Sequence, residues 1–283
     1  MEIKMIGVAG AGLMGSGIAQ VAAQSGFQVI LNDVEKARLD RALSSISGSL
    51  DRFIKKEKIQ AHEKATILSR IRTTTQLSDF SGADFVIEAA TENPKVKLEL
   101  FSELDRICKR GAILVSNTSS ISITKIAKAT SRPDRIAGMH FMNPVPVMKL
   151  VEGIRGRETS EETFEAVRKL SEKMGKTFVA VKDSPAFVVN RILVPMLNEA
   201  VFALQEGLAT KEDIDLAMKL GCGFPMGPFE LLDHVGLDTA LSIMEVMYQD
   251  MNDPKYRPCP LLSQYVAKGW LGKKTGKGFY EYQ

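Results

Sequence analysis

Alternating apolar and polar segments over the first two thirds of the chain predict a β/α repeat. Apolar runs with the length of buried strands lie at residues 3–8, 27–31, 83–90, 112–115, 136–142, 148–151 and 177–181. Stretches with apolar positions at helical spacing lie between several of them, at residues 16–24, 95–109 and 163–174. Such alternation predicts an open, mostly parallel sheet covered by helices on both faces.

Two regions depart from that repeat. Residues 36–72 read as two long polar helices, about 36–56 and 61–70, which form a hairpin inserted into the sheet domain. After Asp183-Ser-Pro185 the chain becomes helical throughout, with patterns at residues 187–204, 211–220, 229–248 and 261–268. The predicted fold is therefore α/β: a Rossmann-type doubly wound sheet with a helical hairpin (residues 1–184), followed by an all-α domain (residues 185–283).

A glycine-rich loop connects the first predicted strand to the first helix. Its sequence is Gly10-Ala-Gly-Leu-Met-Gly15. Gly10 permits a tight turn, Gly12 lets a pyrophosphate approach the backbone, and Gly15 lets the helix pack on the strand. Leu13 and Met14 open the helix, whose N–H groups and dipole favour a phosphate. The strand–loop–helix context predicts a dinucleotide site; an ordinary glycine turn is the alternative.

Asp33 ends the second predicted strand. A carboxylate at this place accepts hydrogen bonds from the ribose hydroxyls of the adenosine and repels a 2′-phosphate. The sequence therefore predicts NAD rather than NADP as the cofactor.

One of three histidines, His140, lies on a predicted strand, and Glu152 follows the next strand after a turn that contains two prolines. Two strands joined by a short turn can lie side by side, which would bring the two residues together. A carboxylate behind an imidazole fixes its tautomer and favours the protonated form, as a general acid/base requires. The alternative is a structural histidine beside a surface glutamate.

Small polar side chains follow other strands at the edge where open α/β sheets bind ligands. Glu92 follows the strand at residues 83–90, and Ser116-Asn-Thr-Ser-Ser120 follows the next. That loop either caps a helix at residues 121–129 or binds a ligand. Because the strand of His140 comes next in the chain, His140 should reach the same edge as Ser119, which favours catalysis. Lys97 lies on the predicted polar face of the helix at residues 95–109.

Composition narrows the class of protein. A net charge of +3 with interspersed charges argues against general nucleic-acid binding, and no segment has the length of a membrane span. The three cysteines are odd in number and far apart, so neither a disulfide framework nor a metal site is expected, and a cytoplasmic location is favoured.

Two further features remain open on residue chemistry alone. Three basic residues cluster at the tip of the helical hairpin: Arg52, Lys55 and Lys56. They form either a solvated helix face or a binding site for a phosphate group on a substrate. Asn190, early in an apolar helix, needs either an interdomain hydrogen bond or a substrate contact.

The sequence resembles the short-chain (S)-3-hydroxyacyl-CoA dehydrogenase family, in particular its bacterial members that act on 3-hydroxybutyryl-CoA. The resemblance covers essentially the whole chain. It rests on the glycine loop, the Ser116–Ser120 segment, the His140 and Glu152 stretch, Asn190-Arg191, and Gly272-Lys-Lys-Thr-Gly-Lys-Gly-Phe-Tyr280. One departure is Ala186, where the family has glycine; a positive φ there would be costly for alanine.

The resemblance implies an NAD-dependent dehydrogenase of acyl-CoA substrates (acetoacetyl-CoA and 3-hydroxybutyryl-CoA) that forms a homodimer through its helical domain. It implies His140 as the catalytic base with Glu152 as its partner, and Ser119 and Asn190 as ligands of the substrate oxygens. The predicted cofactor ligands beyond the glycine loop and Asp33 are Glu92, Lys97, Asn117, Ser119, Asn143 and Lys274, and Arg52, Lys55 and Lys56 become candidate contacts for CoA phosphates.

Three rival interpretations stay open at this point. A dehydrogenase of the same fold could act on a free hydroxy acid or a sugar acid, and activity on the free acid would identify it. A non-catalytic NAD-binding protein could keep the scaffold. NADPH could replace NADH if neighbouring residues compensated for Asp33.

Overall fold

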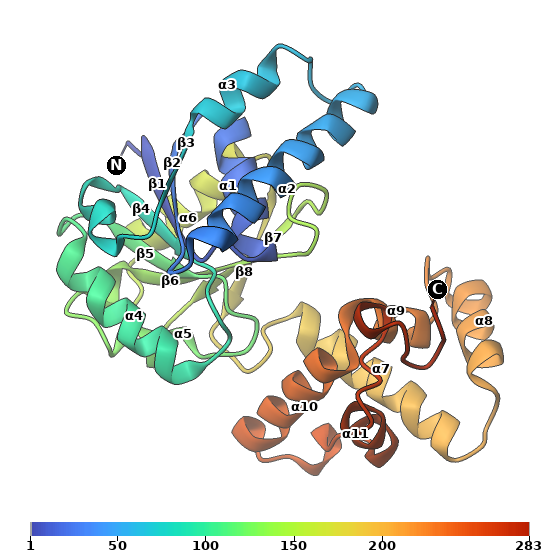
Figure 1. The fold of residues 1–283 in the computed structure, drawn as a ribbon. Coiled ribbons are helices and arrows are strands. Elements are labelled where there is room, and N and C mark those ends of the chain that lie inside the picture. Colours follow the sequence, from blue (N-terminus) through green and yellow to red (C-terminus); the bar gives the residue numbers. More distant parts are fainter. Residues whose placement is uncertain (1, 283) are drawn as a thin grey trace. The chain divides into compact units, whose positions relative to one another are not determined.

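The computed structural model describes residues 2–282 and divides into two compact units, Met1–Ser184 and Pro185–Gln283. Figure 1 shows an α/β unit and an all-helical unit. Among residues 2–282, no helix is both long and apolar enough to cross a bilayer.

The first unit is built on one eight-stranded sheet with the order β3-β2-β1-β4-β5-β6-β7-β8. All neighbouring strands are parallel except β6 and β7, which are antiparallel. The strands are β1 (Met5–Ala9), β2 (Gln28–Asn32), β3 (Ile71–Thr74), β4 (Phe85–Glu88), β5 (Ile113–Ser116), β6 (Ile136–Phe141), β7 (Leu150–Arg155) and β8 (Thr177–Lys182). The central strands are buried along their whole length, as the apolar runs predicted. The predicted doubly wound class is confirmed.

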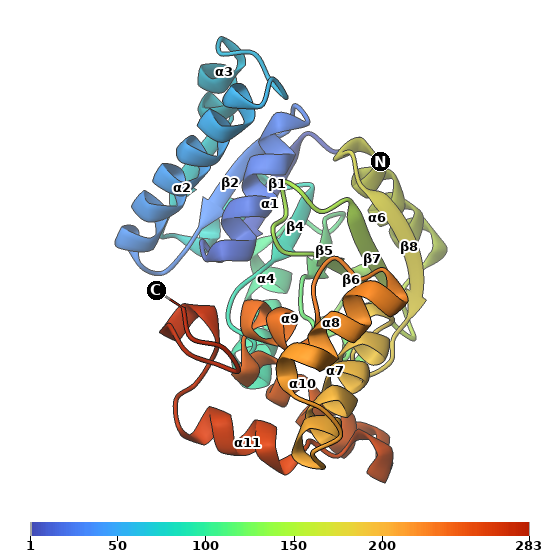
Figure 2. The ribbon, with the colours of Figure 1, turned by 90° about the vertical axis from the view of Figure 1, so that its right-hand side faces the viewer.

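Helices cover the sheet and form the predicted hairpin. They are α1 (Leu13–Gln24), α2 (Lys36–Lys55), α3 (Glu63–Ser69), α4 (Pro94–Ile107), α5 (Ile123–Ala127) and α6 (Glu161–Lys173), with 3₁₀ turns at Leu77–Gly82 and Pro133–Arg135. In the turned view α1 lies over β1 and β2, and the hairpin of α2 and α3 extends away from the sheet (Figure 2). The buried face of α2 is Leu39, Ala42, Ile46 and Leu50, which recur at helical spacing, so its other face remains polar.

The second unit packs five helices around an apolar core. They are α7 (Val189–Gln205), α8 (Lys211–Cys222), α9 (Pro228–Val235), α10 (Leu237–Met251) and α11 (Pro260–Ala267), with 3₁₀ turns at Pro254–Tyr256 and Lys273–Thr275. The single helix predicted over residues 229–248 is wrong. Gly236, with φ of 101°, turns the backbone and separates α9 from α10. The helical spacing of apolar residues continues across this glycine, so the sequence pattern did not show the break.

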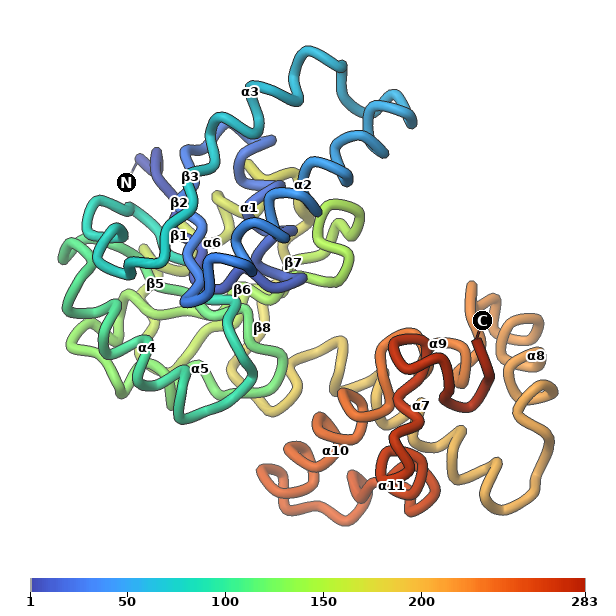
Figure 3. The backbone as a smooth tube through the Cα atoms, in the orientation of Figure 1, coloured from blue at the N-terminus to red at the C-terminus, as the bar shows by residue number. Residues whose placement is uncertain are grey.

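The C-terminal segment is fastened to α9 by a buried aspartate. Figure 3 traces the chain after α11 as it returns toward α9. The carboxylate of Asp233, 1% exposed, accepts hydrogen bonds from the backbone N–H groups of Phe279 and Tyr280, each at 2.8 Å. A Cβ at Gly278 would lie 1.9 Å from Asp233 Oδ1, and one at Gly272 would lie 2.3 Å from the Asp233 carbonyl oxygen. These two glycines of the C-terminal motif are therefore required by packing.

Candidate active site

The glycine loop borders a cavity of about 710 Å³ at the carboxyl ends of β1 and β4. The strand order reverses between these two strands, which is where open α/β sheets bind dinucleotides. A Cβ at Gly10 would lie 2.5 Å from the Ala89 carbonyl oxygen and one at Gly15 only 1.8 Å from the Gly10 carbonyl oxygen. At Gly12, by contrast, a Cβ would meet nothing within 4 Å. The loop thus keeps an open face for a ligand, and the residues fit NAD.

Asp33 lines the same cavity and is itself 7% exposed. Its Oδ2 accepts from the Ala11 N–H at 2.9 Å, and its Oδ1 accepts from the Glu35 N–H at 3.1 Å. The carboxylate therefore joins the glycine loop to the end of β2. It stands where the sequence predicted a ribose ligand, and Arg38, which lines the same cavity, is paired with Glu35 at 2.9 Å.

His140 and Glu152 face each other across the antiparallel pair of β6 and β7, as predicted. His140 Nδ1 lies 2.8 Å from Glu152 Oε2, and the two side chains are 5% and 1% exposed. On the other side of the ring, His140 Nε2 lies 3.0 Å from Ser119 Oγ. If Nδ1 carries the proton toward Glu152, Nε2 presents its lone pair on the side of Ser119 and can accept a proton there, which is the arrangement of a general base. Asn117 Oδ1 accepts from the Phe141 N–H at 2.9 Å and so anchors β6 next to His140.

Glu92 holds the loop of residues 116–120, the serine loop, in place. Glu92 Oε1 accepts hydrogen bonds from the Thr118 hydroxyl at 2.6 Å and from the backbone N–H groups of Ser119 and Ser120 at 2.9 and 3.1 Å. Burial opposes ionisation of this carboxyl, but the positive charge of Lys97 and the hydrogen bonds from the serine loop outweigh it, and the pKa of Glu92 is lowered. Glu92 is therefore a fixed anion beside the loop that holds Ser119.

Lys97 is not on an exposed polar face, contrary to the sequence prediction. Its side chain is 1% exposed, with Nζ at 2.7 Å from Glu88 Oε1 and 3.4 Å from Glu92 Oε2. Glu88, the last residue of β4, was missed by sequence reasoning and is fully buried. The available signal was a carboxylate at the end of an apolar strand, which burial permits only with a partner.

The turn between β6 and β7 is fastened by Lys176, which is 8% exposed. Its ammonium donates to the carbonyl oxygens of Val145 at 2.5 Å and Met148 at 2.8 Å, and burial lowers its pKa. A Cβ at Gly17 of α1 would lie 2.8 Å from Val145 Cβ, so the turn packs directly on the helix after the glycine loop. The predicted cofactor ligand Asn143 is exposed in this turn.

The remaining predicted site residues lie on other elements of the two units. Arg52, Lys55 and Lys56 are exposed at the end of α2. In the second unit, Asn190 is half-buried in the first turn of α7. Lys274 forms an ion pair with Asp238 at 2.6 Å.

Ala186 has φ of 63°, so the position does require the left-handed conformation that the family meets with glycine. Its side chain is fully buried in the core of the second unit. Burial of the methyl group, worth about 0.8 kcal/mol, offsets part of the conformational cost.

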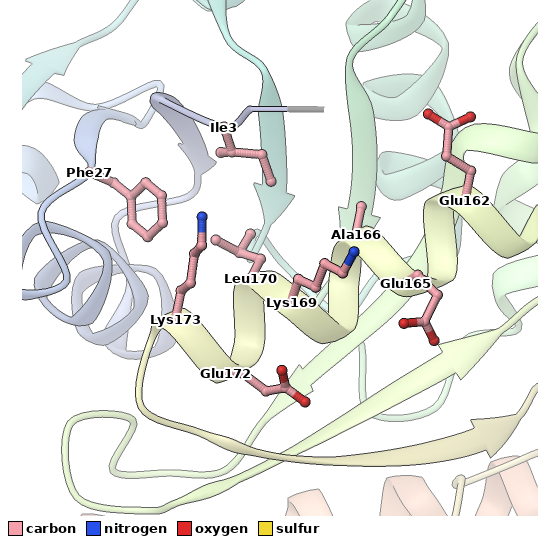
Figure 4. Close-up of a pocket in the computed structure, with 9 residues that line it drawn as sticks. All are labelled: Ile3, Phe27, Glu162, Glu165, Ala166, Lys169, Leu170, Glu172 and Lys173. Atoms are coloured by element: carbon pink, nitrogen blue, oxygen red, sulfur yellow. The ribbon is translucent and has the colours of Figure 1, made fainter.

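A second cavity, of about 550 Å³, lies on the first unit beside α6. Figure 4 shows Glu162, Glu165, Lys169 and Lys173 of α6 around it, with Ile3 and Phe27 on the opposite wall. None of the predicted site residues lines it, and its charges of both signs define no ligand.

Comparison with known proteins identifies the class. The model of the 3-hydroxyacyl-CoA dehydrogenase NAD-binding domain matches residues 5–184, and that of the 3-hydroxyacyl-CoA dehydrogenase C-terminal domain matches residues 187–282. The chain therefore belongs to the 3-hydroxyacyl-CoA dehydrogenase family and is an NAD-dependent oxidoreductase.

Individual relatives match this chain over nearly their full length. A probable 3-hydroxybutyryl-CoA dehydrogenase of Bacillus subtilis is 56% identical over 100% of this chain and 99% of its own. The mitochondrial hydroxyacyl-coenzyme A dehydrogenase of Homo sapiens is 49% identical over 99% of this chain and 92% of its own. The crystal structure of an (S)-3-hydroxybutyryl-CoA dehydrogenase from Ralstonia eutropha, 52% identical, covers both chains completely with a TM-score of 0.96.

Proposed function

We propose that this enzyme interconverts (S)-3-hydroxybutyryl-CoA and acetoacetyl-CoA, with His140 as the acid/base residue. The observation that supports the proposal is the line of hydrogen bonds from Ser119 through His140 to Glu152, at 3.0 and 2.8 Å. It lies at the sheet edge that also holds the glycine loop, so a hydroxyl group beside Ser119 would be near both a base and the cofactor site.

Each residue of the site has one proposed role in the reaction. Bound NAD supplies the acceptor for the hydride that leaves C3. His140 Nε2 takes the proton of the 3-hydroxyl group, and Glu152 stabilises the imidazolium through Nδ1. Ser119 Oγ holds the substrate oxygen within reach of His140. In the reverse direction, His140 returns its proton to the oxygen of the ketone.

The test is acetoacetyl-CoA reduction, followed at the absorbance band of NADH, with NADPH and free acetoacetate run in parallel. We expect rapid oxidation of NADH with the thioester alone. Comparable turnover of the free acid would instead assign the enzyme to free hydroxy or keto acids. Comparable turnover with NADPH would overturn the role of Asp33 in choosing the cofactor.

The hairpin basics Lys55 and Lys56, with Arg52, are proposed to bind the phosphates of CoA. They are exposed where α2 ends, and cations there can meet phosphate without burying an unpaired charge. We expect Lys55→Glu with Lys56→Glu to raise KM for acetoacetyl-CoA about tenfold and to leave kcat and NADH affinity unchanged. Lys36→Glu, at the other end of α2 and 81% exposed, is the matched control and should leave KM unchanged. An equal change in KM in both variants would show that the basic cluster is only a solvated helix face.

Asn190, Asn143 and Lys274 remain proposed ligands on the strength of the family resemblance. We expect Asn190→Ala to raise KM for acetoacetyl-CoA, and Asn143→Ala and Lys274→Met to weaken NADH binding measured by fluorescence. Unchanged constants in a variant would remove that residue from the site.

A homodimer through the helical unit is proposed because this unit exposes large apolar side chains. Ile192, Leu208, Leu216 and Leu220 are 68%, 77%, 50% and 78% exposed. Leu216 and Leu220 lie four residues apart on α8 and so share one face of the helix. An exposed apolar face favours a protein partner, and a second copy of the chain is the simplest one. Light scattering should give twice the mass of 31.1 kDa, and Leu216→Glu with Leu220→Glu should give the monomer. A monomeric unaltered protein would refute it.

A cytoplasmic location is proposed on the basis of the cysteines. Cys108, Cys222 and Cys259 are all free thiols, and Cys222 is exposed. A reducing compartment keeps such thiols reduced. The test is fractionation of the producing cells, and activity found outside the cytosolic fraction would contradict the proposal.

A further inference from the structure

Glu88 is a fully buried carboxylate whose lone pairs are all directed to specific partners. Oε1 accepts from Lys97 Nζ and from the Ala90 N–H, each at 2.7 Å. Oε2 accepts from Lys97 Nζ at 2.9 Å and from Ser116 Oγ at 2.6 Å. Glu88 thus joins three places: the start of the serine loop at Ser116, the backbone after β4 beside the dinucleotide cavity, and α4 through Lys97.

The connections continue from Lys97 to the proposed reaction centre. The same ammonium lies 3.4 Å from Glu92 Oε2, and the other oxygen of Glu92 accepts from the Ser119 N–H at 2.9 Å. Ser119 Oγ then lies 3.0 Å from His140 Nε2. Ion-pair and hydrogen-bond contacts therefore connect the end of β4 to the imidazole, through a Glu92 side chain that is itself 41% exposed.

A contribution to stability does not by itself explain why Glu88 and Lys97 form a buried ion pair. Removing two charges from water is costly, and a well-packed apolar pair of similar volume is often at least as stable. A buried pair is better explained where it fixes a geometry that apolar packing would leave loose. Here the geometry is that of Glu92 and the serine loop, since Lys97 brings together two carboxylates that would otherwise repel each other.

We propose that Glu88 is a positioning residue of the dehydrogenase reaction. It fixes the Lys97 ammonium, which holds Glu92, and Glu92 orders the serine loop so that Ser119 meets His140. The inference rests on the proposed roles of Ser119 and His140. On this account Lys97 acts on the reaction through Glu92, in addition to any contact with the cofactor.

Glu88→Gln removes the charge and keeps an oxygen that can accept from Ser116. We expect kcat at saturating NADH and acetoacetyl-CoA to fall about 10- to 100-fold, the range typical of residues that orient a reactive group. We expect the Kd of NADH, measured by fluorescence, to change less than threefold. An unchanged kcat with weakened NADH binding would overturn the inference and make the pair part of the cofactor site.

A matched control separates positioning from general loss of structure. Asp105 lies on α4, the helix of Lys97, and pairs with a cation, Arg132, at 2.6 Å, with both side chains 9% exposed. Asp105→Asn should lower the thermal midpoint as Glu88→Gln does, and should change kcat less than twofold. Equal losses of kcat in the two variants would show that the effect is only structural.

A double-mutant cycle tests the route through Lys97. If Glu88 acts through Lys97, the combination of Glu88→Gln and Lys97→Met should lose no more kcat than Lys97→Met alone. Losses that multiply would overturn the route. Should Glu88→Gln fail to fold, Glu88→Asp keeps the charge but withdraws it from Ser116; we expect a 3- to 10-fold fall in kcat, and an unchanged kcat would overturn the inference.

The proposed function is tested separately by His140→Gln. A normal kcat in that variant would refute the proposed base. A large fall in His140→Gln together with a normal kcat in Glu88→Gln would refute only the positioning role.

Discussion

Replacing Glu152 by glutamine isolates the charge behind the proposed base. The two side chains are nearly the same size, and the pair is buried, with Nδ1 and Oε2 at 2.8 Å. When His140 holds the substrate proton, a cation faces a carboxylate with charge centres about 4 Å apart. At an effective dielectric constant of about 20, this attraction is about 4 kcal/mol. The amide oxygen of glutamine can still accept from Nδ1–H, but a hydrogen bond to a neutral acceptor is roughly half as strong.

We therefore expect a net loss of about 3 kcal/mol in the transition state, which corresponds to a fall of about 100-fold in kcat. The assay is NADH oxidation at saturating acetoacetyl-CoA, with a thermal melt to show that the variant is folded. Because the two residues act as a unit, His140→Gln with Glu152→Gln should be no slower than His140→Gln alone. A folded Glu152→Gln enzyme with kcat within threefold of the unaltered enzyme would refute the reasoning.

Three further results are expected. His140→Gln should lose about 10²- to 10⁴-fold in kcat with an unchanged melt, and near-full turnover would remove it from the mechanism. Gly12→Ala should fold normally yet bind NADH at least tenfold more weakly, whereas Gly15→Ala should lose thermal stability; the reverse order would contradict the loop geometry. Lys176→Met should cost about 1–3 kcal/mol in urea unfolding, because two carbonyl groups lose their donor. Since burial lowers the pKa of Lys176 from 10.5, the unfolded chain binds more protons between the folded and unfolded pKa values, so this residue makes stability rise with pH there. That rise should vanish in Lys176→Met, and its persistence would assign it to another group.

Most strands of the first unit were predictable because they are short apolar runs in the centre of a sheet. β3, Ile71–Thr74, was not predicted as a strand, and its first two residues were included in the predicted hairpin region. It is one of the two edge strands, paired only with β2, and its residues after Ile71 are polar. Burial on one side only leaves no apolar run for a sequence pattern to detect.

The site was predictable to the extent that it follows from strand ends and register. His140 and Glu152 could be paired because each lies on a strand and a short turn joins the two strands. The environment of Lys97 could not be predicted, because it depends on Glu88, a side chain from another element that meets α4 only in the folded sheet. Helical amphipathicity places a lysine on the exposed face of a helix, but a carboxylate at the end of the neighbouring strand can pair with the lysine and so allow its burial.

The placement of His140 and Glu152 on neighbouring strands has a consequence for how this enzyme can diversify. Their pairing is fixed by the strand register, and residues 142–149 between them contribute no atom to the contact. A slip of one residue in either strand would turn its side chain to the other face of the sheet. The buried Val145 packs on α1, whereas the side chains of Val147 and Lys149 in the same turn are exposed. These exposed side chains can therefore change without a change in the proposed acid/base pair.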